Sequence, residues 1–441
     1  MRRLFSWKRL AIAAVALLVL LVAAPLGYLL AERLRGQSAL DALARRLDAD
    51  DPGWRLDDIV TATNAKLPPE DRNPFVVATA ANDLLPADYS QRFRDFPDRA
   101  TLGPNALLDP AVKAKLLAAM RGMEPALDAA RDLADLPDSG GNVIVMPANP
   151  LNRPMPKEGD LRLTAALLRA DAVLLAEGGK MGESIRSVRA LLGTARGLGD
   201  DPTLIGQLIR MALASVTCGA AESVINLGEP DAGLAELQAE LMKEAAVPKL
   251  LVGLRGERGQ ALYVAENVLG PRLFGQSDLA CLLDLLTQYI KAAKLPPERQ
   301  AAAFAAIPLA PARDPRYALT RMMLPAVEKV SASARRGQGE LVAAAVGVAC
   351  ERHRRRTGQW PATLADIPKD ILPAVPADPC DGLPIRYERL AGHVVVYSVG
   401  PDGIDHGGDL SEATPKDQRD YGIRLYDVSQ RRQPAPPGET P

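Results

Sequence analysis

The longest apolar stretch of this chain lies close to its N-terminus. No charged residue occurs from Leu10 to Ala31, and these about 22 residues, rising about 1.5 Å each as a helix, span the ~30 Å hydrocarbon core of a bilayer. Basic residues precede the run, and short basic flanks are retained in the cytoplasm. We expect a cytoplasmic flank at 1–9 and a single transmembrane helix at 10–31 in a bacterial inner (cytoplasmic) membrane. The N-terminus is then inside and the bulk of the chain is extracytoplasmic.

A cleaved signal peptide is the alternative interpretation of the same stretch. A basic start, an apolar run and Ala23-Ala24 also suit a signal sequence. The run continues past Pro25 for longer than a signal peptide needs, and no lipobox cysteine follows it. The pattern therefore favours an uncleaved anchor, and both interpretations predict export.

Apolar residues at helical spacing dominate the middle of the chain. Residues 32–108 are expected to form a linker with short helices, and 109–336 an irregular helical domain without a solenoid repeat. Asp109-Pro110 and Asp201-Pro202 are typical of helix starts. The expected helices are 38–48, 109–133 with a kink at Pro125, 160–177, 183–198, 204–227, 232–244, 260–268, 278–293 and 317–335. The evenly spaced Gly253, Gly256 and Gly259 are interpreted as a turn.

The pattern changes at the C-terminal end. A helix from Glu340 passes into a basic run, a Pro-rich loop and the strand-like segment 393–400. We expect a small α+β domain with a β-hairpin at 337–428 and a disordered tail at 429–441. The fold class is mostly α, because alanine and leucine dominate the apolar residues while aromatic residues make up only 4%.

Charge and cysteine content narrow the function classes. Lys+Arg number 53 and Asp+Glu 54, so no net charge attracts the chain to nucleic acid. The four cysteines contain no C-x-x-C pair, which argues against a zinc knuckle or a redox motif. Buried free thiols are favoured, and a bridge such as Cys350 to Cys380 is the alternative in an oxidising compartment.

Three motifs stand in the C-terminal domain: G-Q-W-P at 358–361, D-P-C-D-G-L-P-I-R-Y at 378–387 and Y-S-V-G-P-D-G at 397–403. In this order they resemble the C-terminal half of the major pseudopilin of type II secretion systems, over about 340–409. The chain departs from that family because no processing motif precedes the membrane run and Cys380 stands where the family has an aromatic residue. The resemblance therefore implies a borrowed interaction domain more than an ordinary pilus subunit.

The resemblance also implies a calcium site in the loop after the last motif. Ser398, Asp402, Asp405 and Asp409 are the oxygen ligands that this chain offers for calcium. The alternative is that these residues serve only the turn chemistry of a solvated loop. His406 is expected to be exposed and not to be a ligand, since calcium prefers oxygen donors.

No catalytic motif occurs in the sequence. The sequence has only three histidines, and there is no G-x-S-x-G, phosphate loop or H-E-x-x-H pattern. The basic run 352–356 is either an anion site or a solvated helix end. We expect a non-enzymatic envelope protein that binds a protein partner. The alternatives are an accessory component of a type II secretion or pilus-like system, and a cryptic hydrolase with a buried polar cluster.

Overall fold

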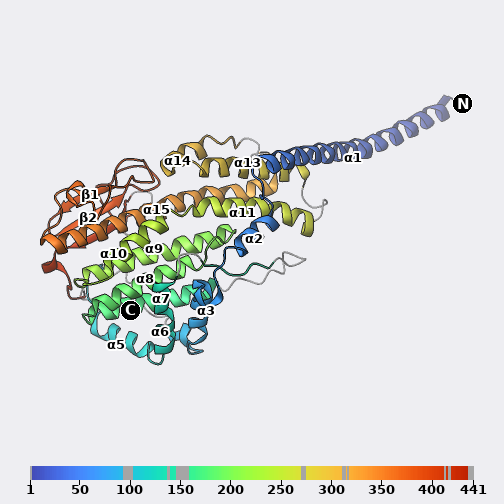
Figure 1. Ribbon diagram of the computed structural model, residues 1–441. Helices are drawn as coiled ribbons and strands as arrows, with labels where there is room; N and C mark the ends of the chain where they lie inside the picture. Colours follow the sequence, from blue (N-terminus) through green and yellow to red (C-terminus); the bar gives the residue numbers. More distant parts are fainter. Residues whose placement is uncertain are drawn as a thin grey trace.

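The computed structural model describes residues 2–92, 103–136, 140–145, 158–269, 275–309, 314, 317–411, 414–415 and 419–435. The chain is mostly helical, with one small antiparallel sheet near its C-terminus (Figure 1). The α-helices are α1 (Arg2–Asp50), α2 (Leu56–Asn64), α3 (Pro74–Asp83), α4 (Tyr89–Arg92), α5 (Pro110–Ala119), α6 (Glu124–Arg131), α7 (Glu158–Glu177), α8 (Met181–Arg196), α9 (Leu204–Asn226), α10 (Leu234–Ala245), α11 (Lys249–Val264), α13 (Gln276–Ala293), α14 (Pro297–Ala305) and α15 (Ala318–Thr357). Short helical turns are η1 (Glu70–Arg72), η3 (Asp132–Asp135), the π-helical η5 (Ala265–Leu269), η7 (Leu364–Asp366) and η8 (Val428–Gln430).

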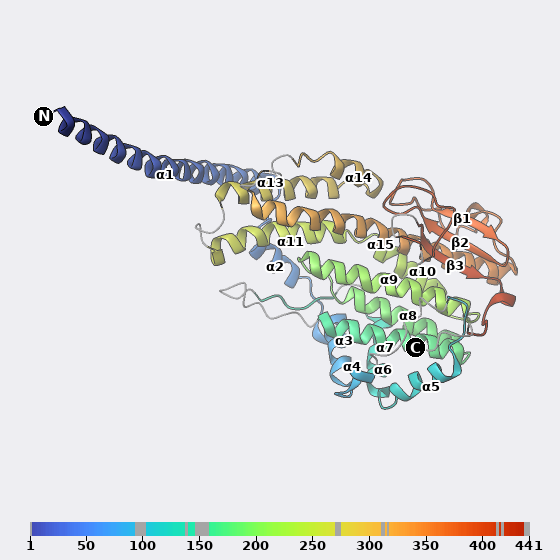
Figure 2. The same cartoon turned by 180° about the vertical axis from the view of Figure 1, so that it is seen from behind.

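Helix α1 projects from the body of the molecule at its N-terminal end (Figures 1 and 2). Its apolar window is long enough to cross a membrane, and none of that window is buried. The second described helix that passes the same test is α9, but most of its window is buried in the core. The predicted short helix 38–48 is the continuation of α1, whose Leu40, Leu43 and Leu47 pack with α13. At Gly36, an added Cβ would lie 2.4 Å from the backbone nitrogen of Ser277, so the two helices touch there.

The helical array largely follows the local signals of the sequence. Helices α7 and α8 pack along each other across the Gly178-Gly179 turn. Asp109 accepts a hydrogen bond from the backbone nitrogen of Ala111 at 2.8 Å and starts α5. The predicted helix 109–133 is wrong in one respect. It is interrupted at Met120–Met123, and Pro125 falls in the first turn of α6, where proline is tolerated.

The glycine-rich segment of α11 differs from the prediction. Gly253, Gly256 and Gly259 do not form a turn but lie inside the helix. An added Cβ at Gly256 would lie only 1.6 Å from the carbonyl oxygen of Pro202, and one at Gly253 only 2.7 Å from Leu204. Glycine is therefore needed here for close packing of α11 against the start of α9.

The predicted C-terminal hairpin is part of a three-stranded sheet. Strands β1 (Arg386–Leu390), β2 (His393–Ser398) and β3 (Tyr421–Tyr426) pair antiparallel in the order β1-β2-β3. The third strand was not predicted, although its side chains alternate between buried and intermediate positions. The sheet lies at the end of the molecule opposite α1 (Figures 1 and 2).

Helix α15 joins the helical array to the sheet. It runs through the expected boundary at 336/337, and its C-terminal half packs on β2 and β3. One hydrophobic core includes Leu191 of α8, Val346 of α15 and Val396 of β2. The two parts therefore share a continuous core.

The assignment of 429–441 to a disordered tail is wrong for its first residues. Arg431 is buried and donates to both carboxylate oxygens of Glu351, at 3.2 and 2.8 Å. Arg354 donates to the same carboxylate at 2.7 and 2.9 Å. Composition could not reveal this pairing, because it depends on a single buried glutamate about 80 residues away. Residues 436–441 lie outside the described residues.

Candidate ligand-binding cavity

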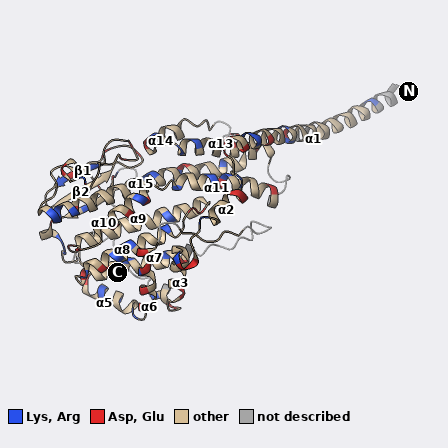
Figure 3. Ribbon diagram, in the orientation of Figure 1, with Lys and Arg blue, Asp and Glu red and all other residues tan. Residues whose placement is uncertain are grey.

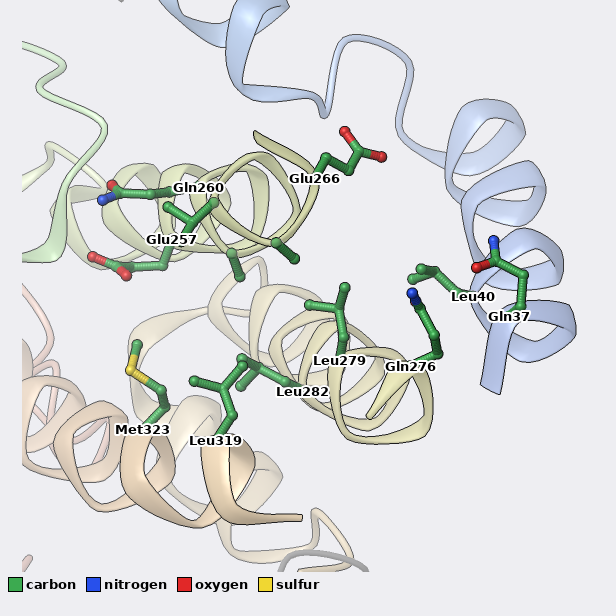
Figure 4. Close-up of a pocket in the computed structure, with 13 residues that line it drawn as sticks. Gln37, Leu40, Glu257, Gln260, Glu266, Gln276, Leu279, Leu282, Leu319 and Met323 are labelled. Carbon is green, nitrogen blue, oxygen red and sulfur yellow. The ribbon is translucent and has the colours of Figure 1, made fainter. Parts of the chain in front are cut away.

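A cavity of about 430 Å³ lies between α1 and the body of the molecule (Figure 4). Its volume falls within the roughly 300–1,000 Å³ range of small-molecule sites. The helices α1, α11, α13 and α15, together with η5, form its walls. The lining side chains are Gln37, Leu40, Glu257, Gln260, Ala261, Val264, Ala265, Glu266, Gln276, Leu279, Leu282, Leu319 and Met323.

The cavity lies a short distance beyond the apolar part of α1. Gln37 follows Ala31 by six residues, or about 9 Å along the helix. The contact of Gly36 with Ser277 fixes α1 against α13 at this point. The cavity therefore has a defined position relative to the apolar segment.

One wall contains a π-helical turn. Helix α11 ends at Val264 and continues as η5, which contributes Ala265 and Glu266. Such turns are rare and are frequent at functional sites, because they redirect side chains within a helix. Glu266 extends from this turn toward α1 in Figure 4. It is exposed, so it lies at the rim.

Most of the wall is apolar. Leu279 and Leu282 of α13 and Leu319 and Met323 of α15 contribute apolar side chains to it (Figure 4). The side-chain oxygen of Gln276 is buried and has no hydrogen-bond partner among the described residues. The wall thus offers an apolar surface with one unused acceptor.

Glu257 is the half-buried carboxylate of the site. One of its oxygens accepts a hydrogen bond from the backbone nitrogen of Leu204 at 3.2 Å, at the start of α9. Burial raises the pKa of this carboxyl, the hydrogen bond opposes the shift, and Asp201 adds to it. None of the thirteen described lining residues is Lys or Arg. The charged side chains of the site are therefore carboxylates without a matching cation.

The structure places the predicted calcium ligands at the opposite end of the molecule, and their oxygens have other partners. Ser398 donates to the buried Asp378 at 2.7 Å. The carboxylate of Asp402 lies 3.0 Å from Nε2 of His406, whose pKa it raises. Asp405 accepts from the hydroxyl of Tyr397 at 3.1 Å.

Asp409 accepts from the backbone nitrogen of Ser411 at 2.9 Å and from the hydroxyl of Thr414 at 2.8 Å. Within the described part of the chain, no group of three or more His, Cys, Asp or Glu side chains is placed to hold a metal ion. Residues 412–413 and 416–418 of the same loop lie outside that part. Calcium binding by this loop stays a prediction.

The basic run 352–356 is mostly engaged in structural contacts. Besides its bonds to Glu351, Arg354 donates to Glu229 at 2.6 Å, and Arg352 donates to Gln238 at 2.7 Å. Arg356 pairs with Asp370 on the surface at 2.8 Å. These contacts favour a helix end over an anion site.

The cysteines are free thiols in the structure. Burial raises the pKa of Cys380 to about 12 and that of Cys350 further. Both thiols are therefore protonated at neutral pH, as expected of small core side chains.

A buried polar cluster does occur among the helices, as a hydrolase would require. Arg210 donates to both oxygens of Glu244 at 2.8 Å, and Lys249 lies 3.0 Å from the same carboxylate. Arg210 also donates to the carbonyl oxygen of Gly199 at 2.8 Å. Arg210, Lys249 and Glu244 are thus paired with one another, as in a structural ion cluster.

Glu257 and the cavity were not predicted from the sequence. Residues 253–259 were expected to form a turn, whereas they belong to α11, and the walls come from segments distant in the chain. Comparisons with models of protein families, with curated proteins and with solved structures find no match to this chain.

Proposed function

We propose that this chain is a single-pass protein of a bacterial inner membrane with a non-enzymatic binding role. In this proposal the N-terminus is cytoplasmic and the body is extracytoplasmic. Its cavity takes the apolar chain of an amphiphile from the adjacent bilayer. The observation that carries the proposal is the position of an apolar cavity about 9 Å beyond the end of the apolar segment of α1.

The distance suits an exchange with the membrane. The headgroup layer adds roughly 5–8 Å to each side of the hydrocarbon core. The cavity would then lie just above the headgroups. A chain that moves from the bilayer into an apolar cavity remains out of water, which keeps the hydrophobic stabilisation it had in the membrane.

Photochemical labelling tests this proposal on the full-length protein in phosphatidylcholine vesicles. The probe is a twelve-carbon alcohol with a diazirine near its far end, and labelled peptides are mapped by mass spectrometry. We expect labels on the cavity-lining parts of α11, α13 and α15. Labelling of the apolar segment of α1 serves as an internal reference. Labels confined to α1 would refute the proposal.

A matched pair of variants shows whether the label enters through the cavity. Met323→Trp fills the cavity and is expected to reduce cavity labelling several-fold relative to α1. Met322 is the neighbouring residue and is 68% exposed, so Met322→Trp is expected to leave labelling unchanged. Equal effects of the two variants would argue that the label enters elsewhere.

A second candidate is the accessory role in a type II secretion or pilus-like system. The packing of α15 on a three-stranded antiparallel sheet supports it, in addition to the three sequence motifs. Leu383 and Ile404 lie exposed on loops of this region, 58% and 57%, and offer apolar contacts to a protein partner. Co-isolation of secretion components with the full chain tests this role. We expect the co-isolation to be lost in a variant that carries both Leu383→Asp and Ile404→Asp.

A further inference from the structure

The charged groups of the cavity have one electrostatic sign. Glu257 and Glu266 contribute carboxylates, and the buried side-chain oxygen of Gln276 contributes an unused acceptor. None of the described lining residues is cationic. A ligand that matches these groups has an apolar chain and a polar end that donates hydrogen bonds.

The N-termini of α15 and α9, which lie near the cavity, do not supply a competing anion site. Leu319 and Thr320 begin α15, and their backbone nitrogens donate to the carboxylate of Asp278 at 2.8 and 3.0 Å. The backbone nitrogen of Leu204 at the start of α9 donates to Glu257. Because carboxylates of the chain already occupy these amides, neither of the two helix ends offers them to an anionic headgroup, and the only charged side chains of the cavity are carboxylates.

Glu257 is only partly satisfied by the protein. Leu204 uses one oxygen, and none of the described residues donates to the other. A partly buried carboxylate without a cation is costly, and the raised pKa of Glu257 is consistent with that cost. A bound cation would remove it.

We propose that the cavity selects bilayer-borne amphiphiles whose polar end is an alkyl ammonium group, and that Glu257 recognises this group. The inference rests on the proposed function, because it assumes that an apolar chain enters the cavity. It adds the charge and the hydrogen-bonding character of the ligand.

The test uses three photoreactive probes with the same twelve-carbon chain, ending in an amine, an alcohol or a carboxylate. Each is applied to the full-length protein in phosphatidylcholine vesicles at neutral pH. Cavity labelling is divided by labelling of the apolar segment of α1 in the same sample, which corrects for partition into the bilayer. We expect a ratio for the amine roughly 10-fold above that for the carboxylate.

Two conservative variants show which carboxylate causes the preference for the amine. Glu257→Gln retains an acceptor for Leu204 but loses the charge, and the amine preference is expected to fall to within about 3-fold. Glu266→Gln changes the exposed carboxylate at the rim and is expected to keep most of the preference. Unlabelled dodecylamine is expected to compete, whereas butylamine is not, because its chain is too short to fill the apolar wall.

The outcomes separate the two proposals. Equal ratios for the three probes, or an amine preference that persists in Glu257→Gln, would overturn the inference on ligand charge. The proposed function would then still stand on cavity labelling by the alcohol. Failure of the alcohol to label the cavity would overturn the proposed function, and the inference with it.

Discussion

Replacing Gly256 by alanine is the sharpest test of how α11 packs beside the cavity. The new Cβ would lie 1.6 Å from the carbonyl oxygen of Pro202, whereas a normal contact between these atoms is about 3.5 Å. The obstacle is backbone and not a flexible side chain, so α11 must move by about 2 Å or the start of α9 must shift. Overpacking of this kind costs about 1–3 kcal/mol, and the upper end applies to a backbone obstacle.

The helix propensity of alanine opposes this cost by about 1 kcal/mol. We therefore expect Gly256→Ala to lower the free energy of unfolding by about 2 kcal/mol. Gly219 is the matched control, because it lies inside α9 with nothing within 4 Å of an added Cβ. Gly219→Ala is expected to raise the free energy of unfolding by about 0.5–1 kcal/mol.

The assay is urea unfolding of the full chain in mild detergent, followed by tryptophan fluorescence. Trp54 is fully buried beside α11, since the guanidinium of Arg258 lies 5.4 Å from the centre of its ring, so it reports on this region. The two variants should shift the urea midpoint in opposite directions. If Gly256→Ala is as stable as the unmodified protein, the close approach of α11 to Pro202 is wrong.

Three further predictions concern buried charge, pH and metal. Glu351→Ala leaves two buried guanidinium groups without their carboxylate, so we expect it to lower the free energy of unfolding by about 3–5 kcal/mol. The surface variant Arg356→Ala is the control and is expected to lower it by less than about 1 kcal/mol. Urea unfolding measures both changes. Because folding raises the pKa of Glu257, the contribution of this group to stability is complete below the unfolded pKa and is lost as pH rises through the folded pKa. Between pH 4.5 and neutral pH, the urea midpoint of Glu257→Gln should therefore fall less than that of the unmodified protein. The calcium hypothesis predicts a rise in melting temperature with calcium that is absent in an Asp405→Asn, Asp409→Asn variant, and identical melting with calcium and with chelator would reject it.

The sequence predicted the elements whose start and stop signals are local. Helices α8, α10 and α13 begin and end within a few residues of expectation, because Gly and Pro breaks separate them. A β-hairpin was expected in this region, and its strand β2 is marked by three consecutive valines. These features depend on neighbours in the chain and not on distant contacts.

The errors occur where tertiary packing overrides local preference. Glycine is unfavourable inside an isolated helix, and the glycines of α11 were expected to form a turn. One helix was expected to end at 335 and another to begin at 340, on either side of Gly337 and Gly339. In the structure α15 continues through Gly337 and Gly339, and an added Cβ at Gly339 would lie 2.5 Å from the hydroxyl of Ser398. The three glycines of α11 and Gly339 each permit a close approach to a partner that is distant in the sequence.

The candidate site could not be predicted from the sequence for the same reason, because it depends on tertiary packing. Its walls combine Gln37, Glu257, Gln276 and Met323, from four helices that no local pattern aligns. A carboxylate between two arginines in the segment R-G-E-R-G is ordinary on a solvated turn. It becomes notable only when the segment is helical and the carboxylate lies on a largely apolar wall.

Helix α15 connects the two ends of the molecule and therefore links the two proposed roles. Leu319 and Met323 in its first turns line the cavity, while Val346 in its C-terminal half lies in the core shared with the sheet. At about 1.5 Å per residue the helix extends roughly 60 Å. Its first turns are held by Asp278 of α13, so a ligand that displaces Leu319 must act against those hydrogen bonds. Any structural response to a ligand that reaches the sheet through α15 must therefore begin at this junction with α13, which also carries the contact with α1.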